Sequence, residues 1–504
     1  MQRLKTDVVI LGTGGAGMAA AISAAEGGAQ VVVFEKRRNF GGISVTGMGI
    51  FAVESRLQKL KNVPFTREQV FKLFMERTHW MADARLVRAY IDKTASTIEW
   101  LEGMGVRFDL LDITTFPGCL NQTGHIVRAP RGGWHGGISA HMIKLMKEHA
   151  EKLGVKFYFA TPVKKIVKTG RRITGVVAAD KGGRTLEVTA GAVIVAAGGY
   201  VHNREMLAKF GGFELGRDFH IMHTIRLEGD GIQMAWAVGA VPDGMYPQLA
   251  GIGVAAGQLE HVEKAKRTTF IGRPHPSINT TSRQPYLWVN LHGMRFVDEG
   301  CGNGPYMANA LVRQKDRVCF TIIDSDTKRH LQGTGVESVT YMDTDSPKIG
   351  DLDADIKSAL TEGLDYACVA DSIKALAAKI KVDASVLQHT IDEYNRFCDK
   401  GHDDLFAKDP RFLRPVRKPP FYAFRRSPSG YGTIGGIKIN EKTEAMGQDN
   451  EAIPGLYAAG DCANGTHTYD YPLVYILWGS TLGFAINSGR IAGENAAKYI
   501  QSVK

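Results

Sequence analysis

The sequence predicts an α/β fold in which an open, mostly parallel sheet is interrupted along the chain by an inserted α+β domain. Two observations lead to this prediction. Residues 7–35 contain a buried strand, a glycine-rich turn, a helix and a second strand, which is the order of a parallel βαβ unit. Another short apolar strand ending in glycine stands at 453–461, so both ends of the chain contribute to one sheet. The 44% of hydrophobic and 23% of charged residues are typical of a globular chain and exclude a disordered one.

The first βαβ unit predicts a dinucleotide site. In its G-x-G-x-x-G turn, Gly12 allows a tight bend, Gly14 lets the backbone approach a pyrophosphate, and Gly17 lets the helix pack on the sheet. The start of the helix presents free N–H groups to the phosphates. Glu35 ends the second strand, where its carboxylate can accept hydrogen bonds from a ribose diol. From this unit we expect cofactor contacts at Gly12, Gly14, Gly15, Ala16, Gly17, Glu35 and Lys36.

A second glycine pattern, at 251–256, is interpreted as a loop. It follows a stretch rich in proline and glycine, and no strand with an acidic end comes after it. We therefore expect no second dinucleotide site.

Three further segments favour a long cofactor. Residues 41–49 are rich in glycine, 191–199 read as a buried strand ending in glycines, and 453–461 end in Gly-Asp. A nicotinamide cofactor needs only the first unit. Dispersed units that close one sheet suit FAD, which lies through such a domain.

These segments resemble a known family when they are taken together with Arg-Phe-Val-Asp-Glu at 295–299, Pro-Phe-Tyr-Ala at 420–423 and the pair 435–436. The family is the succinate dehydrogenase/fumarate reductase flavoprotein superfamily, and the resemblance covers essentially the whole chain. It implies that Ser44 and the neighbouring glycines contact the flavin and pyrophosphate region, and that Asp461 holds the ribityl chain.

The resemblance extends to the last helix. It implies that the helix beginning near Gly479 aims its N-terminus at the N1–C2 edge of the flavin, where the helix dipole stabilises the anionic reduced ring. The members of the superfamily that belong to membrane complexes carry a histidine in the segment that corresponds to residues 41–49, and this histidine bonds covalently to FAD. This chain has no histidine at 41–49, so we expect non-covalent FAD. The further cofactor contacts are expected at Gly41, Gly42, Ser44, Gly47, Gly49, Ala197, Gly198, Gly460, Asp461, Ser480 and Leu482.

The domain order follows from these segments. We expect a Rossmann-like FAD-binding domain split between residues 1–265 and 426–504, and an inserted α+β catalytic (capping) domain at 266–425. A helical pattern at 84–103 belongs to the first domain, and one at 353–399 to the second. The active site is expected between the two domains, against the isoalloxazine ring.

The sequence departs from the fumarate-reductase members of the superfamily. Asn303 stands where their acid arginine is expected, and Gly-Thr-Ile at 432–434 replaces their histidine. Their carboxylate-clamping arginine falls near Ile476. A dicarboxylate mechanism is therefore disfavoured. Instead, the segment from Tyr475 to Gly479 resembles the Tyr-x-x-x-Gly motif of 3-ketosteroid dehydrogenases, and Tyr306 resembles the tyrosine that follows their Arg-Phe-x-x-Glu motif.

The chemistry of this second branch fits these residue types. A tyrosine O–H at Tyr475 and the backbone N–H at Gly479 can polarise one carbonyl oxygen, as an oxyanion hole does. Tyr306 can then handle the proton on Cα, while the hydrogen on Cβ is exchanged as hydride with flavin N5. We therefore predict an FAD-dependent oxidoreductase that adds or removes hydrogen across the Cα–Cβ bond beside a ketone. Tyr475 as a core aromatic residue and Tyr306 as an interface residue remain open.

Two other functions remain open at this point. One is a fumarate-reductase-like reductase of an unsaturated carboxylate, and the other is a flavoprotein subunit that passes electrons to a partner. Polar residues in the second domain and after Asp461 are candidates for substrate binding, and an arginine at the flavin would favour a ketone or enone bearing a carboxylate. These candidates are Arg273, His275, Arg283, His467 and Tyr469.

Charge and cysteine content limit the partners. The formal net charge is +10, but the basic residues are scattered, so we expect no nucleic-acid partner. The 6 cysteines are widely spaced without a C-x-x-C pair, which predicts reduced thiols, no metal site and no haem attachment. No apolar stretch approaches the roughly 20 residues of a membrane span. We expect a cytoplasmic protein without an integral membrane segment, which exchanges electrons with an external carrier.

Overall fold

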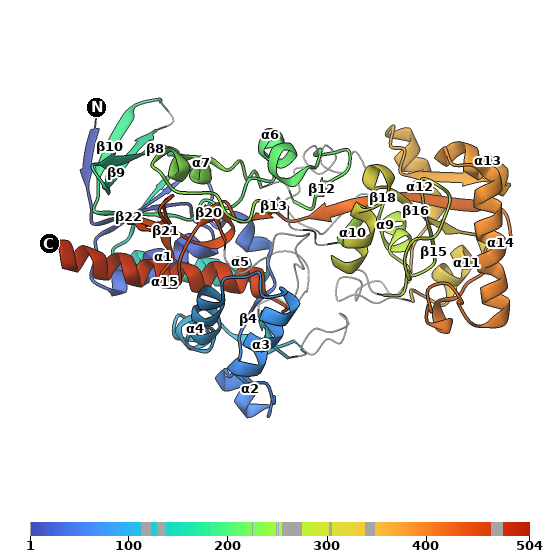
Figure 1. Cartoon of the computed structure of the whole chain (residues 1–504), viewed down its shortest axis with the longest axis horizontal. Helices are drawn as coiled ribbons and strands as arrows, with labels where there is room; N and C mark the ends of the chain where they lie inside the picture. Colours follow the sequence, from blue (N-terminus) through green and yellow to red (C-terminus); the bar gives the residue numbers. More distant parts are fainter. Residues whose placement is uncertain are drawn as a thin grey trace.

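A six-stranded sheet forms the centre of the first domain (Figure 1). The computed structural model describes residues 2–111, 122–128, 138–180, 182–223, 225–247, 249, 251–254, 275–301, 305–337, 348–464 and 477–504. All neighbouring strands of this sheet are parallel except the pair at one edge. In spatial order they are β21 (Glu444–Met446), β22 (Ala452–Ala458), β11 (Ala192–Val195), β2 (Val8–Leu11), β3 (Val31–Glu35) and β7 (Lys156–Phe159). Both ends of the chain therefore complete one sheet, as predicted.

Each face of this sheet is covered by a different layer. One face packs against three helices, α1 (Gly15–Glu26), α5 (Ile138–Lys152) and α15 (Ser480–Val503). Glycines let α15 lie directly on α1, because a Cβ added at Gly489 would stand 2.2 Å from the Ala16 carbonyl oxygen.

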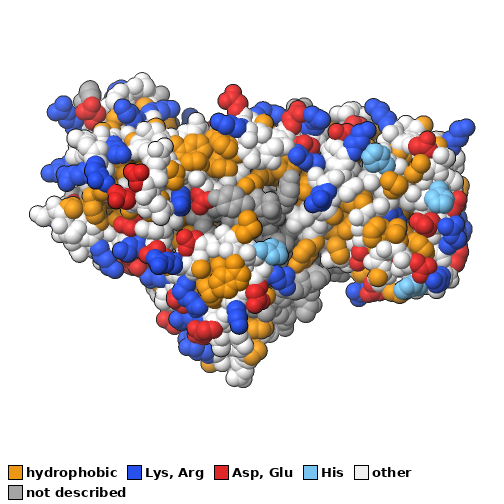
Figure 2. Space-filling view, viewed as in Figure 1, with side chains coloured by type: hydrophobic (Ala, Val, Ile, Leu, Met, Phe, Trp, Pro, Cys, Tyr) orange, Lys and Arg blue, Asp and Glu red, His pale blue; other side chains and the backbone are white. Residues whose placement is uncertain are grey.

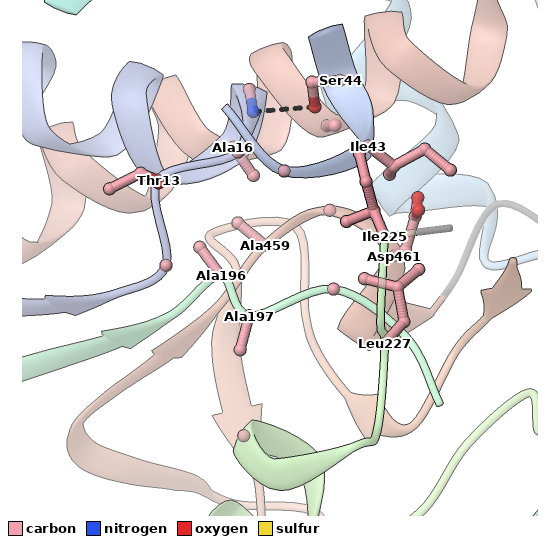
Figure 3. A pocket seen from close by; sticks show the side chains of 18 of the residues that line it. Thr13, Ala16, Ile43, Ser44, Ala196, Ala197, Ile225, Leu227, Ala459 and Asp461 are labelled. Atoms are coloured by element: carbon pink, nitrogen blue, oxygen red, sulfur yellow. Dashed lines mark hydrogen bonds between the residues drawn. The ribbon is translucent and has the colours of Figure 1, made fainter. Parts of the chain in front are cut away.

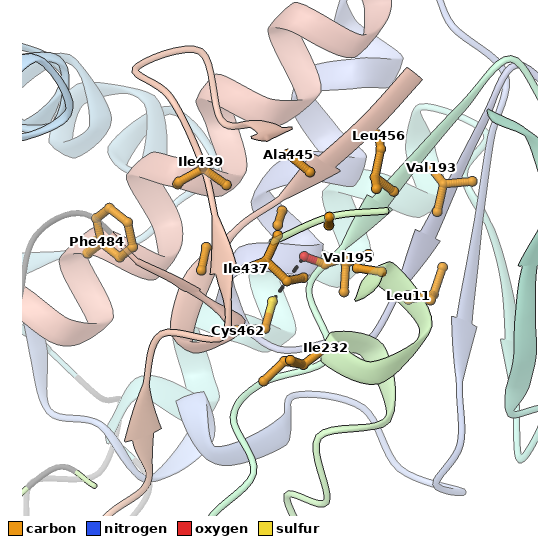
Figure 4. Close-up of a cluster of buried hydrophobic side chains, with 14 of the residues drawn as sticks. Leu11, Val193, Val195, Ile232, Ile437, Ile439, Ala445, Leu456, Cys462 and Phe484 are labelled. Atoms are coloured by element: carbon orange, nitrogen blue, oxygen red, sulfur yellow. Dashed lines mark hydrogen bonds between the residues drawn. The ribbon is translucent and has the colours of Figure 1, made fainter. Parts of the chain in front are cut away.

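The other face packs against a meander sheet and α7 (Asp230–Ala237). In spatial order the meander sheet contains β1 (Gln2–Lys5), β10 (Thr185–Thr189), β9 (Arg172–Ala179) and β8 (Val163–Thr169). Figure 4 shows part of the resulting core, which includes Val193 and Val195 of the sheet, Ile232 of α7 and Ile437.

The first domain also contains smaller sheets and helices. A small sheet contains β4 (Gly49–Phe51), β6 (Gly124–Val127) and β5 (Phe108–Leu110), and two-stranded pairs are formed by β13 (Tyr246–Pro247) with β19 (Thr433–Ile434) and by β20 (Ile437–Lys438) with β23 (Ala463–Asn464). The helices here are α2 (Arg56–Leu60), α3 (Arg67–Arg77), α4 (Ala84–Gly103) and α6 (Arg204–Met206).

The second domain is built on one long strand, β18 (Phe421–Gly430), which runs between the two domains in Figure 1. Every other strand of its sheet is linked to β18 directly or through a neighbour. They are β12 (His220–Ile221), β14 (Gly251–Val254), β15 (Leu287–Asn290), β16 (Cys319–Ile323) and β17 (Ala367–Ala370).

Helices cover both faces of this second sheet. One face carries α9 (Pro276–Ser282), α10 (Pro305–Val312), α11 (Ser325–Gly333) and α12 (Leu352–Thr361), and the other carries α13 (Ile373–Ile380) and α14 (Ala384–Lys400). The alternation of β16 sets this arrangement, because Phe320 and Ile322 belong to the core cluster under α13 and α14, whereas Ile323 belongs to the opposite one.

A buried ion network joins two distant segments of the second domain. Arg295 pairs with Glu299 at 2.8 Å and with Asp403 at 2.7 Å, and Lys408 lies 3.2 Å from Glu299. Because these charges are buried, removing any one would leave a partner uncompensated. The Arg-Phe-x-x-Glu motif thus has a structural role in the second domain.

Two sequence expectations are wrong. Residues 251–254 are not a loop but strand β14, which pairs antiparallel with Arg426–Ser429 of β18. The helical pattern at 353–399 is broken by β17, which also pairs with β18. In both places the pairing edge of β18 decides the conformation, which short local patterns do not reveal.

The expected domain limits are not settled by these elements. The limit near 265 lies outside the described residues, and β18 continues through the limit at 425 without interruption. The two limits therefore stay predictions.

Candidate cofactor and active site

A cavity lies where the carboxyl ends of β2, β3 and β11 meet the starts of α1 and α15 (Figure 3). Ligands of open parallel sheets bind at this edge. The expected cofactor residues that line the cavity are Gly12, Gly14, Gly15, Ala16, Glu35, Lys36, Gly42, Ser44, Gly47, Gly49, Ala197, Gly198, Gly460, Asp461 and Leu482.

Three glycines shape the first turn in three different ways. Gly12 has a φ of 103°, and a Cβ there would lie 2.4 Å from the Ala196 carbonyl oxygen. A Cβ on Gly17 would lie 2.0 Å from the Gly12 carbonyl oxygen, so this glycine lets α1 pack on the turn. Around Gly14 the nearest atom would be Ser44 Oγ at 3.6 Å, which leaves room for a ligand to approach the backbone.

One of the free N–H groups at the start of α1 is bonded to another part of the protein. The Gly15 N–H donates to Ser44 Oγ at 2.8 Å, which Figure 3 shows as a dashed line. Ser44 therefore ties the loop 41–49 to the helix N-terminus, where an anionic pyrophosphate is favoured.

Glu35 is held rigidly at the end of β3. Its Oε2 accepts hydrogen bonds from the Thr13 hydroxyl at 2.6 Å and the Thr13 N–H at 3.1 Å, and its Oε1 accepts one from the Arg37 N–H at 2.9 Å. These bonds fix a carboxylate that can take a ribose diol on its remaining lone pairs.

Lys36 is bound to two carboxylates at the same end of the cavity. Its Nζ lies 2.8 Å from both Glu228 and Asp230. Burial opposes the charge of Lys36, but the hydrogen bonds to Asp230 and Glu228 leave the pKa of its ammonium above the ordinary value. The ammonium is therefore charged and joins the βαβ unit to the start of α7.

Asp461 tests whether FAD fits this cavity. Its carboxylate faces the cavity (Figure 3), and burial raises the pKa of its carboxyl to about 7. A carboxylate in such surroundings is stabilised by hydrogen-bond donors, which the hydroxyls of a ribityl chain supply. FAD would therefore fit the cavity at three points, with its ribose at Glu35, its pyrophosphate at the start of α1 and its ribityl chain at Asp461.

The N-terminus of α15 forms the opposite end of the cavity. Gly479 is the residue that caps this helix, with a φ of 77°, and it lines the cavity. A Cβ on Gly479 would lie 2.7 Å from the Phe51 nitrogen, and its carbonyl oxygen accepts the Phe51 N–H at 3.0 Å. The buried Tyr90 donates its hydroxyl to the Ser480 carbonyl oxygen at 3.0 Å. Two contacts therefore fix the direction in which the helix dipole points.

Three expected cofactor residues lie behind the cavity wall. Gly17 packs α1 against the turn, Gly41 donates its N–H to the Thr13 carbonyl oxygen, and Ser480 is buried under Tyr90. They support the wall, and direct contact of any expected residue with the cofactor stays a prediction.

The expected substrate and proton-transfer residues are dispersed. Tyr306 stands on the first turn of α10, 39% exposed, and its hydroxyl accepts a hydrogen bond from Arg77 Nη1 at 2.9 Å. His275 is buried at the start of α9, with Nδ1 2.5 Å from the Tyr366 hydroxyl. Arg283 ends the same helix near Arg426, whose pKa is lowered by burial and also by the charge of Arg283.

The structure does not bring these three residues to the cavity wall. The other expected residues of this group, Arg273, His467, Tyr469 and Tyr475, lie outside the described residues.

Several lining residues were missed by sequence reasoning. Trp478 and Tyr431 line the cavity, each directly before a residue that the motifs had singled out, Gly479 and Gly432. The position beside a motif glycine was a usable signal for both. The segment 225–231 also lines the cavity, and the sequence motifs did not point to it.

Comparison with known proteins places this geometry in a family. The family model described as "FAD binding domain" matches residues 7–471. The chain belongs to this family of the succinate dehydrogenase/fumarate reductase flavoprotein superfamily.

Two curated relatives and one solved structure illustrate the likeness. The vinyl phenol reductase of Lactiplantibacillus plantarum is 33% identical over 98% of this chain and 96% of its own. A cytochrome-type fumarate reductase of Shewanella frigidimarina is 28% identical over 98% of this chain and 77% of its own. The crystal structure of 3-ketosteroid Δ1-dehydrogenase from Sterolibacterium denitrificans superposes with a TM-score of 0.75 at 18% identity, covering 98% of this chain and 99% of that one, which shows the shared fold.

These findings establish the cofactor and the general reaction. The chain binds FAD and is an FAD-dependent oxidoreductase that acts on C=C or CH–CH bonds. Within the described ranges, none of the helices combines the length and the apolar character needed to cross a membrane.

Proposed function

We propose that this enzyme exchanges hydrogen across a Cα–Cβ bond conjugated to a carbonyl group, as in a ketone or enone. The observation that carries the proposal is the position of Gly479. It caps a 24-residue helix, lies in the cavity wall and is fixed there by Phe51. A helix start aimed into a cavity stabilises negative charge, such as that which develops on an enolate oxygen.

FAD, when bound, supplies or takes up the hydride at N5. The chain's own residues then have two tasks. The helix start at Gly479, with the hydroxyl of Tyr475, holds the carbonyl oxygen. Tyr306, which lies outside the cavity wall in this structure, would have to approach the site to handle the proton at Cα. Because Arg77 is the donor in their hydrogen bond, the phenolic proton of Tyr306 is left to be donated.

A second candidate is the reduction of an unsaturated carboxylate. The 28% identity to a cytochrome-type fumarate reductase favours it. The residues at 303, 432–434 and 476 differ from the carboxylate-binding set of that group, so a different set of cations would have to hold the carboxylate.

The enzyme is further proposed to work in the cytoplasm and to receive or deliver electrons through an external carrier. The 5 described cysteines are free thiols, as expected in a reducing compartment.

Reoxidation of the reduced flavin distinguishes the candidates. The purified protein is photoreduced without oxygen and mixed with a panel of enones, aryl alkenes and enoates while the main flavin absorption band is followed. Recovery with enones supports the proposal. Recovery with fumarate and other enoates alone overturns it in favour of the second candidate, and recovery only with a protein or quinone identifies an electron-transfer subunit.

A further inference from the structure

Lys36 joins two walls of the cavity at its rim. Its Nζ lies 2.8 Å from Glu228 Oε2 and 2.8 Å from Asp230 Oδ2, and all three residues line the cavity. Their side chains are 30%, 39% and 44% exposed. The two ion pairs therefore lie where the cavity opens to solvent.

The ion pairs cross the carboxyl end of β2. Lys36 directly follows β3. The start of α7 lies on β11, because a Cβ added at Gly231 would stand 2.7 Å from Val195 Cγ1 and 2.8 Å from Ala197 Cβ. In the sheet, β2 lies between β3 and β11, and α1 packs on the face opposite α7. A cofactor at the end of β2 is therefore enclosed between the start of α1 and these ion pairs.

The backbone on each side of the ion pairs is held in place. The Glu228 carbonyl oxygen accepts a hydrogen bond from Asn203 Nδ2 at 3.1 Å. The Glu35 carbonyl oxygen, next to Lys36, accepts one from the Thr161 N–H at 2.9 Å. The part that can move is the Lys36 side chain, a flexible four-carbon stem that ends in a point charge.

The strength of these ion pairs suits a contact that opens and closes. A partly exposed ion pair contributes little and is screened by salt, so two of them on one ammonium delay its movement without preventing it. The adenosine end of FAD is expected beside Glu35, and this end of the cofactor would lie nearest to Lys36.

We propose that Lys36, Glu228 and Asp230 form a clasp that controls the entry and release of FAD at the adenosine end of the cavity. The clasp opens when Lys36 leaves both carboxylates, and it closes over the bound cofactor. It acts on the cofactor and does not depend on which substrate the enzyme uses.

The rates of FAD exchange test the clasp. Holoenzyme loaded with radiolabelled FAD is mixed with excess unlabelled FAD to give the dissociation rate, and quenching of FAD fluorescence by the apoprotein gives the association rate. Lys36→Met is expected to raise both rates about tenfold, the effect of losing two partly exposed ion pairs, while the equilibrium affinity changes less than about threefold. Glu228→Gln and Asp230→Asn, which each remove one ion pair, are expected to raise both rates about threefold.

Salt gives a second measurement, and a matched ion pair gives the control. Raising the ionic strength from about 0.05 to about 0.5 M is expected to accelerate FAD dissociation from the unaltered protein, and to change it less in Lys36→Met. The control is Lys93→Met. Lys93 Nζ lies 2.6 and 2.7 Å from the two carboxylate oxygens of Glu494, with side chains 23% and 33% exposed, and joins α4 to α15 outside the cavity wall. Both rates are expected to stay unchanged in this variant.

Three results would overturn the clasp. The first is unchanged rates in Lys36→Met. The second is faster dissociation at an unchanged association rate in Lys36→Met but not in the two carboxylate variants, because Lys36 would then bind FAD directly. The third is equal acceleration in Lys93→Met, which would show a general loss of stability.

Two features keep the test decisive. If Lys36→Met yields no folded protein, the two carboxylate variants and the salt dependence decide by the same criteria. None of the measurements involves an alkene, so the proposed function can fail while the clasp is confirmed, and the reverse.

Discussion

Asp461 has an unusual environment for a carboxyl group, and its role depends on whether the cofactor is present. Burial raises the pKa of this carboxyl to about 7 in the protein alone, against 3.8 ordinarily. The folded apoprotein therefore binds more protons than the unfolded chain between these values. The stability that the Asp461 carboxyl contributes to the folded apoprotein is fully present below about pH 4 and is lost as the pH rises through 7.

Asp461→Asn should therefore have opposite effects on apoprotein and holoenzyme. The apoprotein is expected to lose less stability between pH 5 and 8 than the unaltered one, because the asparagine carries no charge. FAD is expected to bind about tenfold to a hundredfold more weakly, the effect of removing a hydrogen bond to a charged group. Thermal unfolding of the apoprotein against pH and fluorescence titration with FAD measure the two effects. A pH profile that does not change on substitution would contradict the assignment.

Two buried histidines stabilise segment 225–227, which lines the cavity. His202 and His223 each accept a backbone N–H at Nδ1, from Leu227 and Ile225, both at 3.1 Å. Burial lowers the pKa of His202 to about 3 and that of His223 to about 4. The two imidazole rings are neighbours, with 5.5 Å between their centroids. Both rings are neutral at pH 7.

These two histidines predict loss of stability in acid. The unfolded chain takes up protons below about pH 6.5, whereas the folded one resists down to about 4 and 3, so stability present above pH 6.5 is lost as the pH falls. His202→Asn removes one of the two groups. The expected result is a shallower dependence of the unfolding free energy on pH between 4 and 6.5, measured by urea denaturation at each pH. An unchanged slope would show that His202 is not neutral and buried.

At the scale of elements, Tyr90 is one of the two contacts that fix the direction of α15. Its hydroxyl contacts the Ser480 carbonyl oxygen in the first turn, whereas Tyr457 makes a weaker bond of 3.4 Å to the Asn495 carbonyl oxygen farther along the same helix. Only the first of these bonds is next to the cavity. Tyr457 therefore serves as the control for a substitution at Tyr90.

Tyr90→Phe is expected to lower the two-electron potential of the bound flavin by about 10–20 mV, which is part of the free energy of one neutral hydrogen bond. A loosened first turn stabilises the anionic reduced flavin less. Tyr457→Phe is expected to leave the potential unchanged. Equal shifts in the two variants, measured by dye-coupled reduction, would indicate a general effect on stability and not on the helix start.

Elements with a strong local pattern were predictable from the sequence. The strand–turn–helix unit around Gly12 and the helix at 84–103 are found where the pattern places them, because their glycine turn and apolar periodicity are local properties. Strand β14 was missed because Gly-Ile-Gly-Val becomes a strand only when β18 supplies its hydrogen-bond partners.

The residues of the candidate site also divide into those that local motifs predict and those that depend on distant contacts. The residues around the first turn could be named from motifs, since a phosphate-binding turn needs glycines at fixed spacing. The packing of Trp478 on Gly124 joins residues 354 positions apart and depends on the shapes of both, which no single pattern records.

At the scale of the whole molecule, the polar contacts between the described parts of the two domains include one with a predicted catalytic residue. Arg77 of α3 in the first domain donates to Tyr306 of α10 in the second. Figure 1 shows these helices on facing sides of the region between the domains, and Figure 2 shows basic and acidic side chains intermixed across the visible face of both.

Tyr306→Phe separates proton transfer from domain contact. As a proton donor or acceptor, Tyr306 is expected to contribute about 100-fold to kcat, and its loss is expected to change the pH profile. Arg77→Met removes the contact but leaves the phenol, so its effect is expected mainly on KM. Equal losses of kcat in both variants with unchanged pH profiles would show that Tyr306 acts only through the contact.

The most direct measurement of the proposed reaction is a single turnover of the photoreduced holoenzyme, mixed rapidly and without oxygen with an enone or with fumarate at equal concentration. Recovery of the oxidised flavin band is predicted to be at least ten times faster with the enone and to yield one saturated ketone for each flavin, in line with a carbonyl oxygen held at the start of α15. Faster recovery with fumarate, or no recovery with any enone, would contradict the proposal.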